Sequence, residues 1–73
     1  MTVQQLLENG KAILRNNNID NFSNEARWIF EAAFDCGREF IIFHSDDEAD
    51  AEKSSVYFEM INRRAGGEPV QYV

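Results

Sequence analysis

The sequence contains only one cysteine and one histidine among its 73 residues, and both scarcities exclude kinds of site. A single cysteine, Cys36, cannot form a disulfide within the chain. Nothing in the composition requires an oxidising compartment, so we expect a cytoplasmic protein. Cys36 and His44 have no further soft ligands to complete a four-coordinate site, which excludes structural zinc.

Long apolar runs are also missing. The first fifteen residues, MTVQQLLENGKAILR, mix polar and charged side chains among the apolar ones. A signal peptide or a membrane span needs an unbroken apolar core, so we expect neither here. The last residues, EPVQYV, are apolar and aromatic without the polar composition common at a free end, and we expect the chain to be part of a longer protein.

Basic residues are scarce as well. Seven Lys and Arg stand against thirteen Asp and Glu, which gives a formal net charge of -6. Such a charge repels phosphate backbones unless the basic residues cluster tightly. Nucleic acid is therefore a poor candidate for the main partner.

The length of 73 residues fits one small domain and leaves little room for a complete cofactor-dependent enzyme. The residues are 44% hydrophobic and 12% aromatic, which is enough apolar bulk to fold without a metal or a disulfide. We expect a globular domain of modest stability.

Apolar residues recur with helical spacing from the start of the chain. Thr2 and Gln5 have the spacing of a capping box, which predicts a helix that runs to about Asn16. The asparagines at 16–18 tolerate left-handed backbone at a helix end, and Ile19 can then fold back onto the apolar face. The members of that face are Val3, Leu6, Leu7, Ile13 and Leu14.

A second helix is predicted after a polar turn. Asp20, Asn21 and Ser23 form the turn and offer an N-cap. Glu25 suits the positive end of the helix dipole, and Gly37 supplies the stop. The apolar stripe of this helix consists of Ala26, Ile29, Phe30, Ala33 and Phe34.

The run 40–43, Phe-Ile-Ile-Phe, could by itself be a buried strand, but helical neighbours and the lack of a partner strand favour a short helix. Ser45 and Glu48 repeat the capping-box spacing and open a last helix, which Gly66 and Gly67 end. One face of it carries Val56, Tyr57, Met60, Ile61 and Arg64.

Pro69 suits the first position of one more helical turn, in which Val70 and either Tyr72 or Val73 pack back. No internal repeat or long linker interrupts the pattern. The sequence therefore predicts an all-α fold, a small bundle of four to five helices.

Gly10 and Trp28 each have two interpretations. Gly10, in the middle of a helix, either admits another helix closely or is a tolerated surface glycine. Trp28 lies off the centre of its stripe, so it either covers the edge of the core or forms part of a docking surface.

The acidic residues between positions 46 and 52 suggest a calcium loop, because such loops alternate carboxylates with other residues. Counted from Asp46, the sixth position holds Ala51 where the sharp turn needs glycine, and the twelfth holds Tyr57 where a bidentate glutamate belongs. We attribute the carboxylates to the first turn of a helix, where its dipole favours them.

A nucleophilic pair of Cys36 and His44 is formally available, but the neighbouring charge of Asp35 raises the pKa of a thiol. The Gly66–Gly67 pair has no apolar strand before it, and Pro69 after it removes a backbone donor, so it does not form a phosphate loop. We predict no catalytic, cofactor-binding or metal-binding residue in this chain.

Arg63 and Arg64 stand together at the end of the last predicted helix, where they complement the negative end of its dipole. Two guanidinium groups beside a glycine turn could also hold a carboxylate of another domain or of a partner through bidentate hydrogen bonds. Both interpretations stay open at this point.

The stretch 61–73, INRRAGGEPVQYV, closely resembles the segment that joins the helical and catalytic domains of HemK/PrmC-type protein-(glutamine-N5) methyltransferases of peptide chain release factors. The stretch 23–34, SNEARWIFEAAF, agrees more loosely but in register, so the resemblance spans essentially the whole chain. The positions that match the junction, where the resemblance implies contacts between domains or with a partner, are Arg63, Arg64, Gly67, Glu68, Pro69, Gln71 and Tyr72.

The resemblance implies a parent enzyme whose N-terminal bundle, residues 1–73, helps to grip the release factor. A separate catalytic domain, entered through 61–73, would bind S-adenosylmethionine and methylate the glutamine of a Gly-Gly-Gln loop. The family's Asn-Pro-Pro-Tyr motif and glycine-rich cofactor loop have no counterpart here, so no catalytic or cofactor residue is carried over. The alternative is a free-standing helical protein-protein interaction module without catalytic activity, with Trp28 as a docking aromatic.

Overall fold

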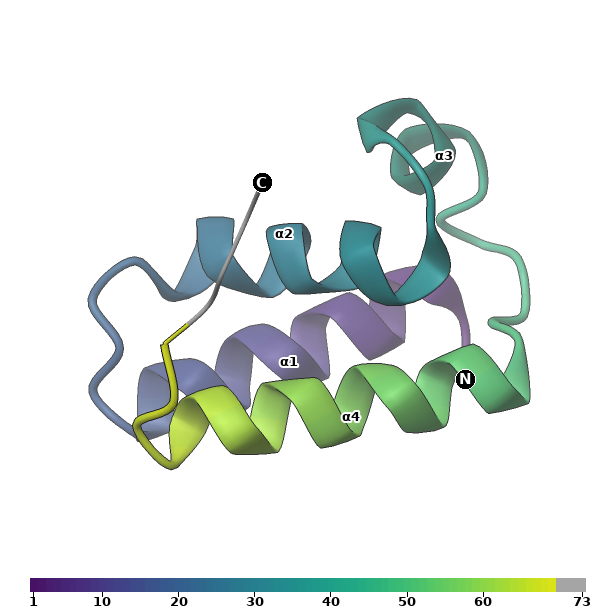
Figure 1. Ribbon diagram of the computed structural model, residues 1–73. Coiled ribbons are helices and arrows are strands. Elements are labelled where there is room, and N and C mark those ends of the chain that lie inside the picture. Colours follow the sequence, from purple (N-terminus) through teal and green to yellow (C-terminus); the bar gives the residue numbers. More distant parts are fainter. Residues whose placement is uncertain (70–73) are drawn as a thin grey trace.

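The computed structural model describes residues 1–69, and most of them are helical. The long helices α1, α2 and α4 lie side by side as a three-helix bundle, and short α3 stands at one end of it (Figure 1). Within the described residues, this confirms the predicted small all-α bundle. The helices are α1 (Val3–Asn16), α2 (Phe22–Phe34), α3 (Arg38–Phe43) and α4 (Ala51–Ala65).

The core forms where the apolar faces of α1, α2 and α4 meet. Tyr57 and Ile61 of α4 are buried as predicted, but Val56, predicted on the same face, is 46% exposed. This part of the prediction was wrong, because Val56 lies outside the face of α4 that packs against α1 and α2. The buried residues are Val3, Leu6, Leu7, Leu14, Ala26, Ile29, Phe30, Phe34, Tyr57 and Ile61; Ile13, Ala33 and Met60 pack partly buried against them.

At Gly10 the side chain of Tyr57 in α4 lies directly against the backbone of α1. A Cβ atom at residue 10 would lie 2.0 Å from the hydroxyl oxygen of Tyr57, so the tyrosine ring occupies the space that a side chain would fill. The hydroxyl donates a hydrogen bond to the carbonyl of Ala26 in α2, at 3.2 Å. Of the two interpretations of Gly10, the structure supports the close approach of another helix.

The start of α1 is capped both locally and from far along the chain. The predicted capping box is present, because the Thr2 hydroxyl accepts from the Gln5 amide while the Gln5 side chain accepts from the Thr2 amide. The amides of Val3 and Gln4 donate to the carbonyls of Asp47 and Ser45, at 2.9 and 3.0 Å. The free N–H groups of the first turn therefore all have acceptors.

The predicted left-handed end of α1 and the predicted glycine end of α4 are both confirmed. Asn18 has a φ of 63° and Gly67 a φ of 104°. In each case the next residue donates its amide back over the last turn, and Ile19 packs against the core. For α2 the predicted stop was wrong: Asp35, with a φ of 50°, ends the helix two residues before Gly37.

The start of the last helix also differs from the prediction. α4 begins at Ala51, and its N-cap is Asp50, whose carboxylate accepts from the Lys53 amide at 3.0 Å. Ser45 does not cap α4, since it lies in the link that covers the start of α1. The N-cap of α2 is Asn21, one of the residues predicted to offer a cap, but it makes no side-chain capping bond, and Ser23 lies inside the helix rather than in the turn.

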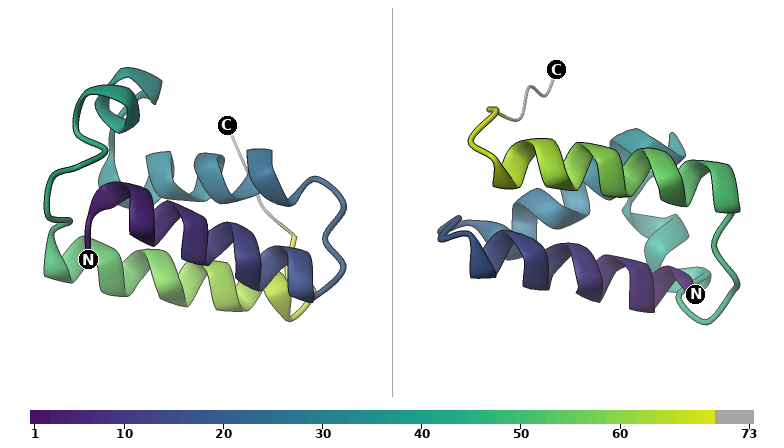
Figure 2. Two further views of the ribbon diagram at one scale, coloured as in Figure 1. Left: turned by 180° about the vertical axis from the view of Figure 1, so that it is seen from behind. Right: turned by 90° about the horizontal axis from the view of Figure 1, so that it is seen from below.

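The run 40–43 belongs to helix α3, as predicted, rather than to a strand. Phe40 and Ile41 pack partly buried against the core, and no residue of α3 is fully buried. Seen from behind, α3 lies beyond the start of α1, and residues 44–50 run from it to α4 (Figure 2). The further turn predicted from Val70 onward lies outside the described residues.

Candidate interaction surfaces

Arg64 and Glu25 join the end of α4 to the start of α2. The Nε atom of Arg64 donates to Glu25 Oε1 at 2.5 Å, and a second guanidinium nitrogen reaches Oε2 at 3.4 Å. Both side chains are largely buried, at 23% and 14% exposure. The hydrogen bond to Glu25 raises the pKa of Arg64, which stays charged.

Arg63 and Glu68 form a second pair on the surface beside it. Arg63 donates two nearly parallel hydrogen bonds to the carboxylate of Glu68, at 2.6 and 2.9 Å. These bonds lower the pKa of Glu68 and raise that of Arg63. Because Gly67 turns the chain back between them, the pair closes the residues after α4 onto its last turn.

The structure thus gathers most of the predicted junction residues at one place, which we call the C-terminal corner: Glu25, Arg63, Arg64, Gly67, Glu68 and Pro69. Sequence reasoning predicted that the arginines could hold a carboxylate of a partner; in this chain both hold carboxylates of the domain itself. In the sequence, the only indication of a role for Glu25 was its position in the first turn of a predicted helix. Gln71 and Tyr72 lie outside the described residues.

Trp28 lies on α2, three residues after Glu25, and is half-buried. It belongs neither to the buried core nor to the fully exposed surface. Its assignment as a docking aromatic stays a prediction.

Of the acidic residues between 46 and 52, only Asp50 and Glu52 lie at the start of a helix as predicted, since Asp50 caps α4 and Glu52 lies in its first turn. Because α4 starts at Ala51, Asp46, Asp47 and Glu48 precede the helix rather than fill its first turn. Glu48 pairs with the N-terminal ammonium group, and Asp47 lies 2.6 Å from the Nδ1 atom of His44. No group of three or more potential metal ligands occurs in residues 1–69.

Cys36 and His44 have separate surroundings. Burial raises the pKa of the Cys36 thiol, and the charges of Glu31 and Asp35 raise it further against the opposing effect of Lys53. The predicted effect of Asp35 is confirmed in direction. His44 stacks on Phe40, with ring centroids 4.5 Å apart, and bonds Asp47.

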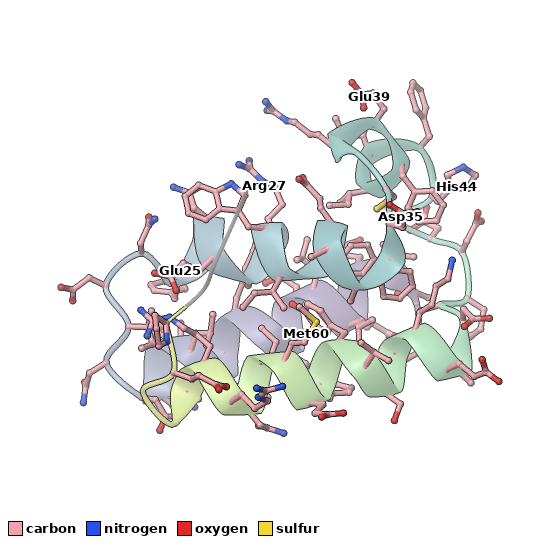
Figure 3. All side chains as sticks on the ribbon, viewed as in Figure 1. Glu25, Arg27, Asp35, Glu39, His44 and Met60 are labelled. Carbon is pink, nitrogen blue, oxygen red and sulfur yellow. The ribbon has the colours of Figure 1, made fainter. Side chains whose placement is uncertain are left out.

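A surface that sequence reasoning missed lies on α3. Ile42 is 61% exposed and Phe43 is 80% exposed, although both are large apolar residues. The signal was available in the sequence, because four consecutive apolar residues cannot all face the core from one short helix. Figure 3 shows Glu39 on α3, with Asp35 and His44 at its two ends.

None of the helices in residues 1–69 has the length and apolar character needed to cross a membrane. A family model described as the PrmC N-terminal domain matches residues 5–73 of the chain. The search of curated proteins found no match, and the search of solved structures found none either. The family match includes the bundle from the first turn of α1 onward, together with the C-terminal corner.

Proposed function

Because the chain belongs to the family of PrmC N-terminal domains, we propose that it binds and positions the protein substrate of a methyltransferase. The substrate is a peptide chain release factor, and the acceptor is the glutamine of its Gly-Gly-Gln loop. A catalytic domain elsewhere in the parent protein binds S-adenosylmethionine and transfers the methyl group to the amide nitrogen. The family match over residues 5–73 carries this proposal.

The contribution of the domain to the reaction is positioning. A substrate held at two places reaches the catalytic site with less loss of rotational and translational freedom than one held at the site alone. The rigidity of the bundle supports this role, since its three long helices share one core and α4 is tied to α2 by a partly buried ion pair.

We assign the C-terminal corner to the junction with the catalytic domain, together with Gln71 and Tyr72. Arg63 and Glu68 fix how the chain leaves α4, and Arg64 and Glu25 fix α4 to α2. Together, these two ion pairs set the direction of the next domain relative to the bundle. Their geometry is bidentate, which restrains orientation as well as distance.

The proposal is tested by methyl transfer to a purified release factor, with the full-length parent enzyme and a form that lacks residues 1–73. We expect the deletion to raise KM strongly and to leave kcat nearly unchanged, because it removes binding that substrate and transition state share. A short peptide containing Gly-Gly-Gln is the control substrate, since it is too small to reach the bundle. Unchanged kinetics with the release factor would refute a substrate-binding role.

A further inference from the structure

Helix α3 presents two adjacent large apolar side chains to solvent. Ile42 and Phe43 are 61% and 80% exposed, while Met1 and Val56, the other exposed large apolar residues in the described part, lie singly on other elements. Exposed apolar side chains cost free energy that contact with a partner recovers. Aromatic residues in such positions are frequent anchors in protein interfaces.

The chain holds α3 from both sides. Before it, the left-handed Asp35 turns the chain, and the amide of Cys36 donates to the carbonyl of Glu31 in α2. After it, the carbonyls of Ser45 and Asp47 accept from the first turn of α1. Phe40 and Ile41 anchor α3 on the core, while the exposed Ile42 and Phe43 project from the same short helix. A preordered surface loses less entropy on binding.

The charges around α3 are mostly negative. Glu39 lies one turn before Phe43, so the two side chains share a face. Asp35 precedes the helix, and Asp46 and Asp47 follow it, all exposed. Arg38, the only basic residue of α3, lies one turn before Ile42 and is also exposed. An apolar centre with an acidic rim complements an apolar pocket whose rim carries Lys or Arg.

The position of α3 in the bundle helps to identify the molecule that binds it. Residues after α4 leave from the C-terminal corner, whereas α3 stands at the opposite end of the bundle (Figure 1). The 15 residues of α4 separate the two ends by about 22 Å. A domain joined at the C-terminal corner has its first contacts there, which favours a separate molecule as the partner of α3.

We propose that Ile42 and Phe43 of α3 insert into an apolar pocket of the substrate protein, and that Lys or Arg residues at the rim of that pocket face Glu39, Asp46 and Asp47. This inference rests on the proposed function and names the surface that performs it.

The test uses the full-length parent enzyme and a purified release factor, with Phe43→Ser and Ile42→Ser. We expect Phe43→Ser to raise KM about tenfold or more, the usual effect of losing an interface anchor, with kcat unchanged. Val56→Ser is the control, since it removes an exposed apolar side chain from α4 and should change KM less than about twofold. All three residues are exposed, so circular dichroism should show unchanged helix content.

A second pair of variants tests the charges. Glu39→Lys should lower kcat/KM several-fold at low salt and make kcat/KM less dependent on salt. Glu59→Lys changes the charge equally at an exposed position of α4, and neither effect should follow from it. If deletion of residues 1–73 raises KM but Phe43→Ser does not, the assignment of α3 is refuted and the proposed function stands. If neither the deletion nor Phe43→Ser affects KM, the proposed function and the assignment of α3 are both refuted. A loss of kcat or of thermal stability in Phe43→Ser would instead place α3 against the parent's own catalytic domain and overturn the assignment.

Discussion

Gly10 and Tyr57 determine how closely α1 and α4 can pack. The tyrosine is fully buried and lies over the glycine, and its hydroxyl reaches across to α2. Three helices therefore meet at one side chain. Inside a regular helix alanine is more favourable than glycine, so helix propensity does not explain Gly10. The space that Tyr57 occupies does explain it.

We expect Gly10→Ala to destabilise the domain by about 2 kcal/mol, since overpacking a core outweighs the gain in helix propensity. Urea unfolding followed by circular dichroism measures this. Gly66→Ala is the control, because a Cβ atom there meets only ordinary contacts at 3.5 Å, and its effect should stay within about 0.5 kcal/mol. Tyr57→Phe should reduce the cost of Gly10→Ala, and strictly additive effects would contradict the contact.

Glu68 offers a pH-dependent probe of the C-terminal corner. Arg63 lowers the pKa of its carboxyl group in the folded chain. The stability from this pair is therefore present above the ordinary pKa of a glutamate and is lost as the pH falls through the lowered value. Arg63→Gln should return the pKa of Glu68 toward its ordinary value in a carboxyl NMR titration. Arg64→Gln should leave it unchanged, since Arg64 bonds Glu25, and an equal shift in both variants would contradict the pairing.

At the scale of the element, the start of α4 shows how two local patterns compete. Ser45 with Glu48 and Asp50 with Lys53 both offer a side-chain acceptor three residues before an amide donor. The chain uses Asp50, because the carbonyls of Ser45 and Asp47 are bonded to α1 and hold that link in a non-helical path.

We expect Asp50→Ala to destabilise the domain by about 1 kcal/mol, the usual cost of losing an N-cap. Ser45→Ala should cost less than about 0.5 kcal/mol, because Ser45 contributes its backbone carbonyl and the substitution keeps it. Thermal or urea unfolding of the two variants under one set of conditions measures the difference. A larger loss of stability in Ser45→Ala than in Asp50→Ala would show that Ser45 is the N-cap of the last helix, as its capping-box spacing predicted.

At the scale of the whole molecule, the start of α1 depends on a link that follows two further helices. Amides in a first helical turn usually exchange with solvent quickly because they lack acceptors. Here Val3 and Gln4 have acceptors in residues 45–47, and the carbonyl of Met1 accepts from Ala49. The first turn therefore opens only when this link detaches.

Hydrogen exchange followed by NMR tests this dependence. We expect the amides of Val3 and Gln4 to exchange about 100-fold more slowly, after correction for intrinsic rates, than those of Ala51 and Glu52 at the same positions of α4. Equal protection of the two first turns would show that the link is not fastened to α1 in solution.

Much of the fold could be predicted from the sequence. The apolar faces of α1 and α2, the capping box at Thr2 and the left-handed turn at Asn18 all follow from residues a few positions apart. The ends of α2 and the start of α4 could not, because several polar residues there offer similar caps. Of the candidate site, Arg63, Arg64 and Glu68 were identified, but the pairing of Arg63 with Glu68 and the contact of Arg64 with Glu25 were not, and the roles of these residues as a junction stay predictions.

The sequence by itself determined the helical class, the apolar faces of α1 and α2 and the family, because periodicity and short motifs are properties of neighbouring residues. Only the tertiary structure decided that Gly10 receives Tyr57, that Arg64 reaches Glu25, and that Ile42 and Phe43 stay outside the core. Each of these outcomes depends on which elements meet in space. Burial and ion pairing between distant residues follow from that packing, and no local pattern specifies it.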